Sequence, residues 1–184
     1  MASTRLGQDD DLQKKIAAAL GMPPGSEEQS ATDHRRRYGL TIGGQRFLLD
    51  LSDHVHVVDV PRAFRLPNTR RWFLGVVNLR GSLVPLFDLA ACFELPEAPA
   101  DRRMMLVLGD GDDAAGTIID GPPRHVLVGE NQETAQAPVL HPIASSHATT
   151  AYRLSDGIWV ELDWHGLFVE ARARSLVRSS NLEA

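Results

Sequence analysis

Two histidines have the spacing of a possible metal site. His54 and His56 are separated by one residue, so on a strand their side chains would lie on the same face and could supply the first two ligands. No third ligand can be placed from the sequence, and we favour surface or groove-lining histidines over metal ligands. A small metal-dependent enzyme stays open as an alternative that depends on these two residues.

The acidic run 110–113 is a second candidate. Asp110, Asp112 and Asp113 resemble half of a calcium-binding loop, but the glutamate that such a loop needs at its twelfth position is absent. We therefore interpret this run as the solvated tip of a hairpin.

The remaining reactive side chains give no catalytic pattern. Ser146 and His147 are adjacent, yet nothing in the sequence fixes the geometry of a triad with Asp163. Cys92 is the single cysteine and lies among apolar residues, which predicts a buried structural thiol. Glycine loops that bind phosphate and the nucleophile-elbow motif are missing. The residues therefore predict a module that is not an enzyme and has no metal or cofactor.

Composition narrows the class of protein. The chain has 184 residues, of which 43% are apolar and 23% charged, as expected for one soluble domain with tails. Its formal charge of -5 argues against nucleic-acid binding, which relies on clustered Lys and Arg. No apolar run approaches the roughly 18 residues that suggest a membrane span, and the acidic start lacks a signal-peptide core. We expect a cytoplasmic protein without membrane insertion.

The elements that must position these residues are short strands. Alternating or apolar runs bounded by turn residues predict an all-β body with no long helical pattern. The predicted strands are residues 38–42, 45–51, 55–60, 75–79, 83–87, 103–108, 115–119, 125–128, 151–154 and 157–162. Short helices are possible at 88–93 and 164–171, and 132–150 is interpreted as a long connection.

The ends of the chain differ from this body. Residues 1–37 are predicted to form an extension, with a short helix at 11–20 followed by a polar linker. The domain itself is expected at 38–171, and 172–184 is expected to be a flexible tail.

The segment 72–89 is the most informative part of the sequence. Its two strands are almost continuously apolar, and Arg80 is the only charged side chain between them, in the loop formed by Arg80, Gly81 and Ser82. An arginine at such a hairpin tip could bind a partner carboxylate through two hydrogen bonds, or could simply aid solubility. Pro85 has no N–H to donate, which predicts a sheet edge or a bulge at that position.

This segment resembles the CheW-like coupling domain of bacterial chemosensory systems. The resemblance rests on residues 75–81 (GVVNLRG), on Val84-Pro85 and on Asp88-Leu89, with supporting matches in the same order from 38 to 170. It implies two small five-stranded β-barrel subdomains around a shared apolar core. It also implies a non-enzymatic adaptor for chemotaxis or twitching motility, which couples the cytoplasmic tip of a chemoreceptor (a methyl-accepting chemotaxis protein) to the regulatory domain of a CheA-type histidine kinase in a two-component system.

The resemblance also implies which residues bind partners. The central block supplies one group and the strand at 55–58 supplies part of a groove for receptor helices. The residues concerned are Asn78, Leu79, Arg80, Gly81, Val55, His56, Val57 and Val58. Family members usually carry a glutamate in that strand, so a histidine at 56 could make partner affinity depend on pH.

The N-terminal extension and residues 70–73 (RRWF) are similar to the branch of this family that serves type IV pilus-based twitching motility. A scaffold of the same fold with a different partner is the second alternative that the sequence leaves open.

Overall fold

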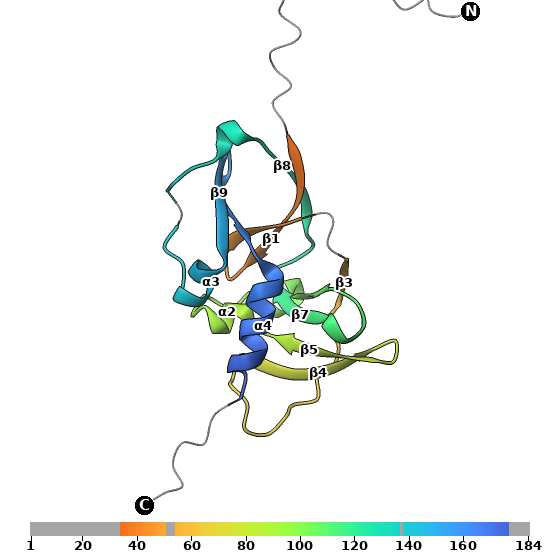
Figure 1. The fold of residues 1–184 in the computed structure, drawn as a ribbon. Coiled ribbons are helices and arrows are strands. Elements are labelled where there is room, and N and C mark those ends of the chain that lie inside the picture. Colours follow the sequence, from red (N-terminus) through yellow and green to blue (C-terminus); the bar gives the residue numbers. More distant parts are fainter. Residues whose placement is uncertain (1–33, 51–53, 137, 177–184) are drawn as a thin grey trace, which may run out of the picture. The chain divides into compact units, whose positions relative to one another are not determined.

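The computed structural model describes residues 34–50, 54–136 and 138–176, which contain ten strands and three α-helices (Figure 1). The chain divides into two units, residues 1–33 and 34–184. The helix predicted at 11–20 and the last eight residues lie outside the described part. The body is mainly β, as the sequence predicts.

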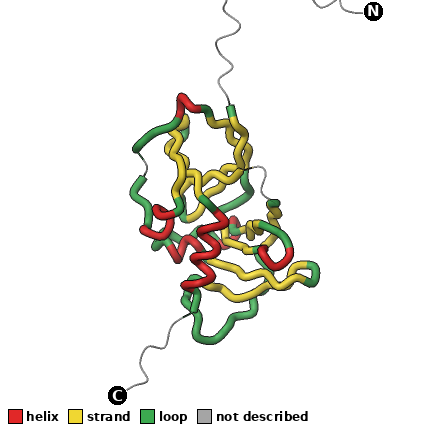
Figure 2. Tube along the Cα trace, viewed as in Figure 1, coloured by secondary structure: helices red, strands yellow, loops and turns green. Residues whose placement is uncertain are grey.

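The first sheet has the strand order β8-β1-β2-β10-β9. Its strands are β8 (Arg124–Val128), β1 (Arg35–Ile42), β2 (Gln45–Asp50), β10 (Gly157–Leu162) and β9 (Ala148–Leu154). Neighbours are antiparallel except β2 and β10, which are parallel. Glu133, just after β8, forms a bridge with Tyr152 of β9, so the two edges of the sheet meet. Figure 2 shows the outer strands of this sheet curving toward each other.

The second sheet repeats this design with the order β3-β6-β7-β5-β4. Its strands are β3 (Val55–Asp59), β6 (Met104–Leu108), β7 (Ala115–Ile119), β5 (Ser82–Phe87) and β4 (Phe73–Leu79). Here β5 and β7 form the parallel pair. Phe64, after β3, closes the sheet against β4: its N–H donates to the Val76 carbonyl at 2.8 Å, and the Val76 N–H donates back at 3.0 Å.

Glycine at position 75 allows this closure. Gly75 has φ +125°, and a Cβ there would overlap the carbonyl oxygen of Phe64. Only glycine combines that backbone conformation with so close an approach. The two five-stranded subdomains implied by the resemblance are confirmed.

One large apolar cluster joins the two sheets. It draws buried side chains from both sheets and from the helices, including Phe47, Phe87, Leu106, Val160 and Phe168. Each sheet also has a smaller cluster. The cluster of the second sheet contains Val77, Val84, Leu86, Met105, Val107, Ala114 and Ile118, and that of the first contains Leu48, Val126, Val128, Tyr152 and Trp159. The shared core therefore packs the two subdomains against each other.

Two of the helices begin at aspartates. The carboxylate of Asp88 accepts the Ala91 N–H at 3.0 Å and caps α2 (Leu89–Cys92). Asp163 caps α4 (Trp164–Arg174) through the Gly166 N–H, also at 3.0 Å. Such caps satisfy N–H groups that the first turn of a helix leaves free. Cys92 is buried, as predicted, and burial raises the pKa of its thiol to about 11.

The structure extends or shortens several predicted elements. β1 begins at Arg35, three residues before the expected strand, and α4 continues to Arg174, three residues past the expected end of the domain. The stretch 132–150 is more structured than predicted, since it contains α3 (Pro142–Ser146) and the start of β9. A five-residue helix is too short to show apolar periodicity, so no pattern in the sequence predicts α3.

The prediction of a sheet edge or a bulge at Pro85 is wrong, because β5 is an interior strand between β7 and β4 and the irregular pairing lies between Phe73 and Gly75. Pro85 pairs with Val76 of β4, while the ladder to β7 includes only Leu86 and Phe87. The side of β5 that faces β7 is therefore unpaired at Pro85, which fits a residue without an N–H.

Candidate partner-binding site

The hairpin between β4 and β5 presents Arg80 at its tip. Leu79 pairs with Ser82, so the loop has two residues, one fewer than predicted, with φ +53° at Arg80 and +96° at Gly81. Positive φ at both positions is typical of the tight turns that join twisted strands. The Asn78 side-chain oxygen accepts the Gly81 N–H at 2.9 Å and fixes the turn. Asn78 and Gly81 therefore shape the loop that holds Arg80.

The Arg80 side chain is exposed, and no described residue offers it a hydrogen bond or an ion pair. Leu79 is half-buried and packs against the cluster of the second sheet, while Leu83 is exposed on the other side of the turn. A free guanidinium beside apolar side chains can bind a carboxylate through two parallel hydrogen bonds. The hairpin tip is thus suited to binding a carboxylate.

The second predicted group, on β3, is divided between two clusters. Val58 packs against the cluster of the second sheet, the same one that Leu79 contacts. Val55 and Val57 are half-buried and pack against the shared core. Val58 and Leu79 therefore pack against the same cluster, whereas Val55 and Val57 pack against the core that the two subdomains share.

His54, just before β3, and His56, on β3, lie near Asp110 in the loop between β6 and β7. His54 Nδ1 lies 2.9 Å from Asp110 Oδ2, and His56 Nε2 lies 3.8 Å from Asp110 Oδ1. All three side chains are exposed, and for Asp110 this is what a solvated hairpin tip predicts. Within residues 34–50, 54–136 and 138–176, no group of three or more His, Cys, Asp or Glu side chains could hold a metal ion.

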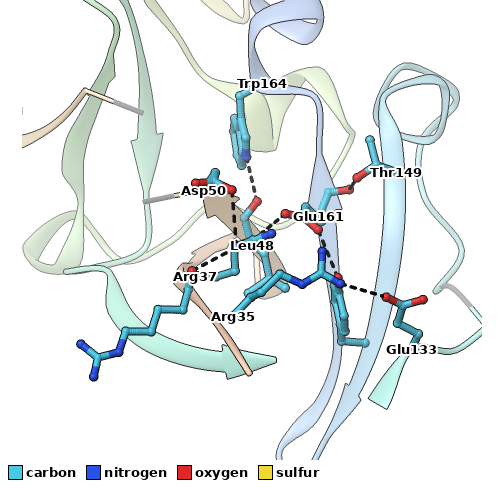
Figure 3. Close-up of polar contacts among 10 residues, drawn as sticks. Arg35, Arg37, Leu48, Asp50, Glu133, Thr149, Glu161 and Trp164 are labelled. Carbon is cyan, nitrogen blue, oxygen red and sulfur yellow. Dashed lines mark hydrogen bonds and ion pairs between the residues drawn. The ribbon is translucent and has the colours of Figure 1, made fainter. Parts of the chain in front are cut away.

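A network in the first sheet was not found from the sequence (Figure 3). The buried Arg37 donates from Nε to Glu161 Oε1 at 2.6 Å and lies 3.4 Å from Asp50 Oδ2 through Nη1. Tyr152 also donates to Glu161, at 3.4 Å. Nearby, Trp164 Nε1 donates to the Leu48 carbonyl at 2.8 Å. Arg37 and Glu161 are 124 residues apart, so no local pattern could have paired them.

A cleft of about 510 Å³ was also not predicted. It lies between the β6–β7 loop and α4, and its lining includes His54, Asp113, His165, Phe168 and Arg172. Arg172 donates to the Ala114 carbonyl at 2.7 Å and to the Asp113 carbonyl at 3.2 Å, so it ties α4 to that loop. None of the eight predicted partner-binding residues lines this cleft.

Residues 38–172 match the family model of the CheW-like domain. The chain belongs to this family. Protein PilI of Pseudomonas aeruginosa is 32% identical over 103 residues, which are 55% of this chain and 56% of that protein. A Chemotaxis protein CheW, from Treponema pallidum, is 26% identical over 164 residues, which are 79% of this chain and 95% of that protein.

The match to other relatives is shorter. A Probable chemotaxis protein CheW from Rhizobium etli is 29% identical over 87 residues, which are 47% of this chain and 56% of that protein. The chain thus spans about half the length of the first curated relatives it matches. The crystal structure of scaffolding protein TtCheW from Thermoanaerobacter tengcongensis superposes with a TM-score of 0.63 at 19% identity, over 79% of this chain and 94% of that one. This likeness shows that the chain has the same fold as that protein.

The hairpin that presents Arg80 contains the sequence block on which the resemblance to the CheW-like family rests. The GVVNLRG run that carries the resemblance forms most of β4 and its turn, so the family block and the exposed Arg80 are the same feature. As for membranes, none of the helices in the described ranges has the length and apolarity needed for a span.

Proposed function

We propose that this CheW-like protein is a non-enzymatic cytoplasmic adaptor that couples a chemoreceptor tip to a CheA-type histidine kinase. The observation that carries the proposal is the match to the CheW-like domain over residues 38–172. The display of Arg80 at the hairpin tip supports it, because a free guanidinium next to apolar side chains suits a protein contact. The regulatory domain of the kinase is the proposed partner on one side, and the receptor tip on the other.

Such an adaptor acts by unequal affinity. A protein that binds active and inactive kinase geometries equally well shifts neither population. The adaptor must therefore make contacts that differ between the two states. Arg80 can do this from its turn, which the Asn78 side chain stabilises, since a displacement of the partner carboxylate would break the two hydrogen bonds that it accepts.

We propose that the adaptor acts in a chemosensory pathway, and that the output of this pathway is type IV pilus-based twitching motility. The support is the similarity to Protein PilI, whose match covers 55% of the chain. Chemotaxis is the alternative output, since relatives named chemotaxis protein CheW also match.

The experiment is to mix the purified full chain separately with a chemoreceptor signalling tip and with the kinase regulatory domain, and to measure each dissociation constant. We expect Arg80→Glu to weaken at least one of them by about tenfold or more, because it replaces an attraction for carboxylate with a repulsion. Arg36→Glu is the matched control, since Arg36 is also an exposed arginine whose side chain has no described partner but lies on the first sheet.

A folded Arg80→Glu protein that binds both partners like the wild type would remove Arg80 from the site. Binding of neither partner by the wild type would contradict the coupling function. Metal analysis of the same preparation tests the enzyme alternative, which requires stoichiometric zinc or iron.

A further inference from the structure

Five exposed arginines follow one another along and beside β4. They are Arg62, Arg65, Arg70, Arg71 and Arg80. Among the described residues, none of these five guanidinium groups has a hydrogen bond or an ion pair. Six arginines elsewhere do contact carboxylates, namely Arg35, Arg37, Arg46, Arg103, Arg124 and Arg174. Unpaired positive charge is therefore concentrated in this part of the second sheet.

The same stretch carries no negative charge of its own. Residues 60–83 include no Asp or Glu, and the nearest carboxylates in the sequence are Asp59 and Asp88. The chain as a whole has a formal charge of -5. A local positive field on an acidic protein attracts acidic partners and speeds their association.

Apolar side chains are interleaved with these arginines. Phe64 is 58% exposed, Leu66 45%, Val60 41% and Leu83 66%. Exposed apolar groups that occur singly need no explanation, but a run of them between unpaired arginines has the composition of a protein interface, in which aromatic residues and Arg are enriched.

The backbone that carries this stretch is held in place. Phe64 exchanges two hydrogen bonds with Val76 of β4. The Arg70 N–H donates to the Ser175 carbonyl at 2.8 Å, and Thr69 forms a bridge with Leu176 after α4. Figure 1 shows the connection from β3 to β4 as the yellow loop beside β4. These few contacts limit the conformations of the loop before binding, which lowers the conformational entropy lost when a partner docks.

We propose that residues 60–71 together with Arg80 and Leu83, here called the arginine surface, bind an acidic segment of a protein partner with apolar side chains of its own. The partner's carboxylates pair with the arginines, and its apolar side chains cover Phe64 and Leu66. The inference rests on the proposed function, because that function names the candidate partners, and it extends the docking site well beyond the hairpin tip.

The observations favour a protein over an anionic membrane. All five cations are arginines and residues 60–83 contain no lysine, which is the composition of protein interfaces, where Arg is enriched and Lys is depleted. The exposed apolar side chains keep only about half of their surface free, which suits a flat contact better than insertion into lipid.

The test is a double charge reversal away from Arg80. Arg62→Glu/Arg65→Glu changes the loop only, and Arg36→Glu/Arg102→Glu makes the same charge change at two exposed arginines outside the surface. The dissociation constants of the full chain with the receptor tip and with the kinase regulatory domain are measured at low and at moderate salt. We expect the loop variant to lose about tenfold or more in affinity for one partner and to show a weaker salt dependence, with no such change in the control. Phe64→Ala, at an exposed side chain, should weaken binding of the same partner without altering the thermal midpoint of the protein.

If the wild type binds a partner and the loop variant binds it equally well with the same salt dependence, the arginine surface is excluded while the proposed function stands. If the wild type binds neither partner, the proposed function fails and this inference fails with it. Binding to phosphatidylglycerol vesicles that is lost in the loop variant, with partner affinity unchanged, would overturn the protein partner in favour of a lipid surface.

Discussion

Arg37 is a charged side chain in a position where burial disfavours charge. Its side chain is 10% exposed, and that of its partner Glu161 is 17% exposed. Burial opposes the charged guanidinium, but the hydrogen bond and the charge of Glu161 outweigh it and raise the pKa of Arg37. For Tyr152, which donates a hydrogen bond to the same Glu161, burial is the main cause of a raised pKa. The charges of Arg37 and Glu161 are therefore each stabilised by the other.

Removal of one member of this pair should be costly. We expect Glu161→Ala to lower the free energy of unfolding by about 3–5 kcal/mol, because Arg37 would keep a buried charge without its main partner. The double variant Arg37→Met/Glu161→Met should lose much less unfolding free energy than Glu161→Ala, since it removes both charges. Urea unfolding of the two variants checks this, and equal losses would show that the charge balance is unimportant.

Asp156, in the turn between β9 and β10, makes a pH-dependent contribution to the stability of the fold. It accepts from Trp159 Nε1 at 2.9 Å and from Arg124, whose guanidinium also lies over the Trp159 ring at 4.8 Å. The hydrogen bond from Trp159, followed by that from Arg124, lowers the pKa of Asp156 below its usual 3.8. A carboxyl with a lower pKa in the folded state adds stability above its unfolded pKa and loses it as the pH falls through the folded value.

We therefore expect Asp156→Asn to have a lower thermal midpoint than the wild type at neutral pH, and the difference to shrink as the pH falls below about 4. Thermal unfolding from about pH 6 to about pH 3 checks the trend. Asp101→Asn, at an exposed carboxyl without a described contact, is the control. A difference that stays constant over this range would contradict the role of the Asp156 charge.

At the scale of elements, Asp120 links the two sheets. It follows β7, and its carboxylate accepts the Gly43 N–H at 3.1 Å and the Gly44 N–H at 2.9 Å in the turn between β1 and β2. Its own N–H donates to the Thr41 carbonyl at 2.9 Å. A carboxylate with two acceptor oxygens fits two adjacent N–H groups, so the end of one sheet fixes a turn of the other.

Asp120→Ala should destabilise the protein by about 1–3 kcal/mol, because both N–H groups lose a charged acceptor. Asp120→Asn should cost less, since the amide retains one acceptor oxygen. Chemical denaturation of the three proteins measures the difference. An Asp120→Ala protein as stable as the wild type would mean that water replaces the carboxylate fully.

Local patterns were sufficient to find the strands but not their ends. The predicted strands 38–42 and 45–51 leave the two glycines at 43 and 44 as a turn, and in the structure Ile42 pairs with Gln45. The start of β1 depends instead on pairing with β8, from Arg35 with Val128 onward, which no nearby residue reveals. The end of α4 depends on Arg172, which binds carbonyls some 58 residues away.

The same limit applies to the candidate site. The display of Arg80 follows from two strands and a turn, all of them adjacent in sequence, and it could be predicted. The contact of Val58 and Leu79 with one cluster depends on how β3 and β4 lie in the closed sheet. The arginine surface depends on the bridge between Phe64 and Val76, which no pattern in the sequence indicates.

For the whole molecule, the shared core should make the two sheets unfold together. Phe87 of β5 is fully buried in that core, with its ring centre 5.3 Å from that of Phe73 and 5.8 Å from that of Phe168 in α4. Its partners thus come from the second sheet and from the helix that follows the first. Loss of this ring weakens the contact between the subdomains as well as one of them.

We expect Phe87→Ala to lower the free energy of unfolding by about 3–5 kcal/mol, with a single transition for both sheets. Leu79→Ala, at a half-buried side chain, should lose less. Far-ultraviolet circular dichroism and tryptophan fluorescence, followed in the same urea titration, check both points. Separate transitions by the two methods would show that the subdomains unfold independently.

The closure of the second sheet has a consequence for motion. β1 and β2 pair through six residue pairs, whereas the edges of the second sheet meet through the single bridge between Phe64 and Val76. Short contacts of this kind open more readily than long ladders. The amide hydrogens of these two residues should then exchange with solvent earlier than those inside the sheet. A partner bound to the loop would slow that exchange. Hydrogen exchange at the Phe64 and Val76 amides would then report whether the partner is bound.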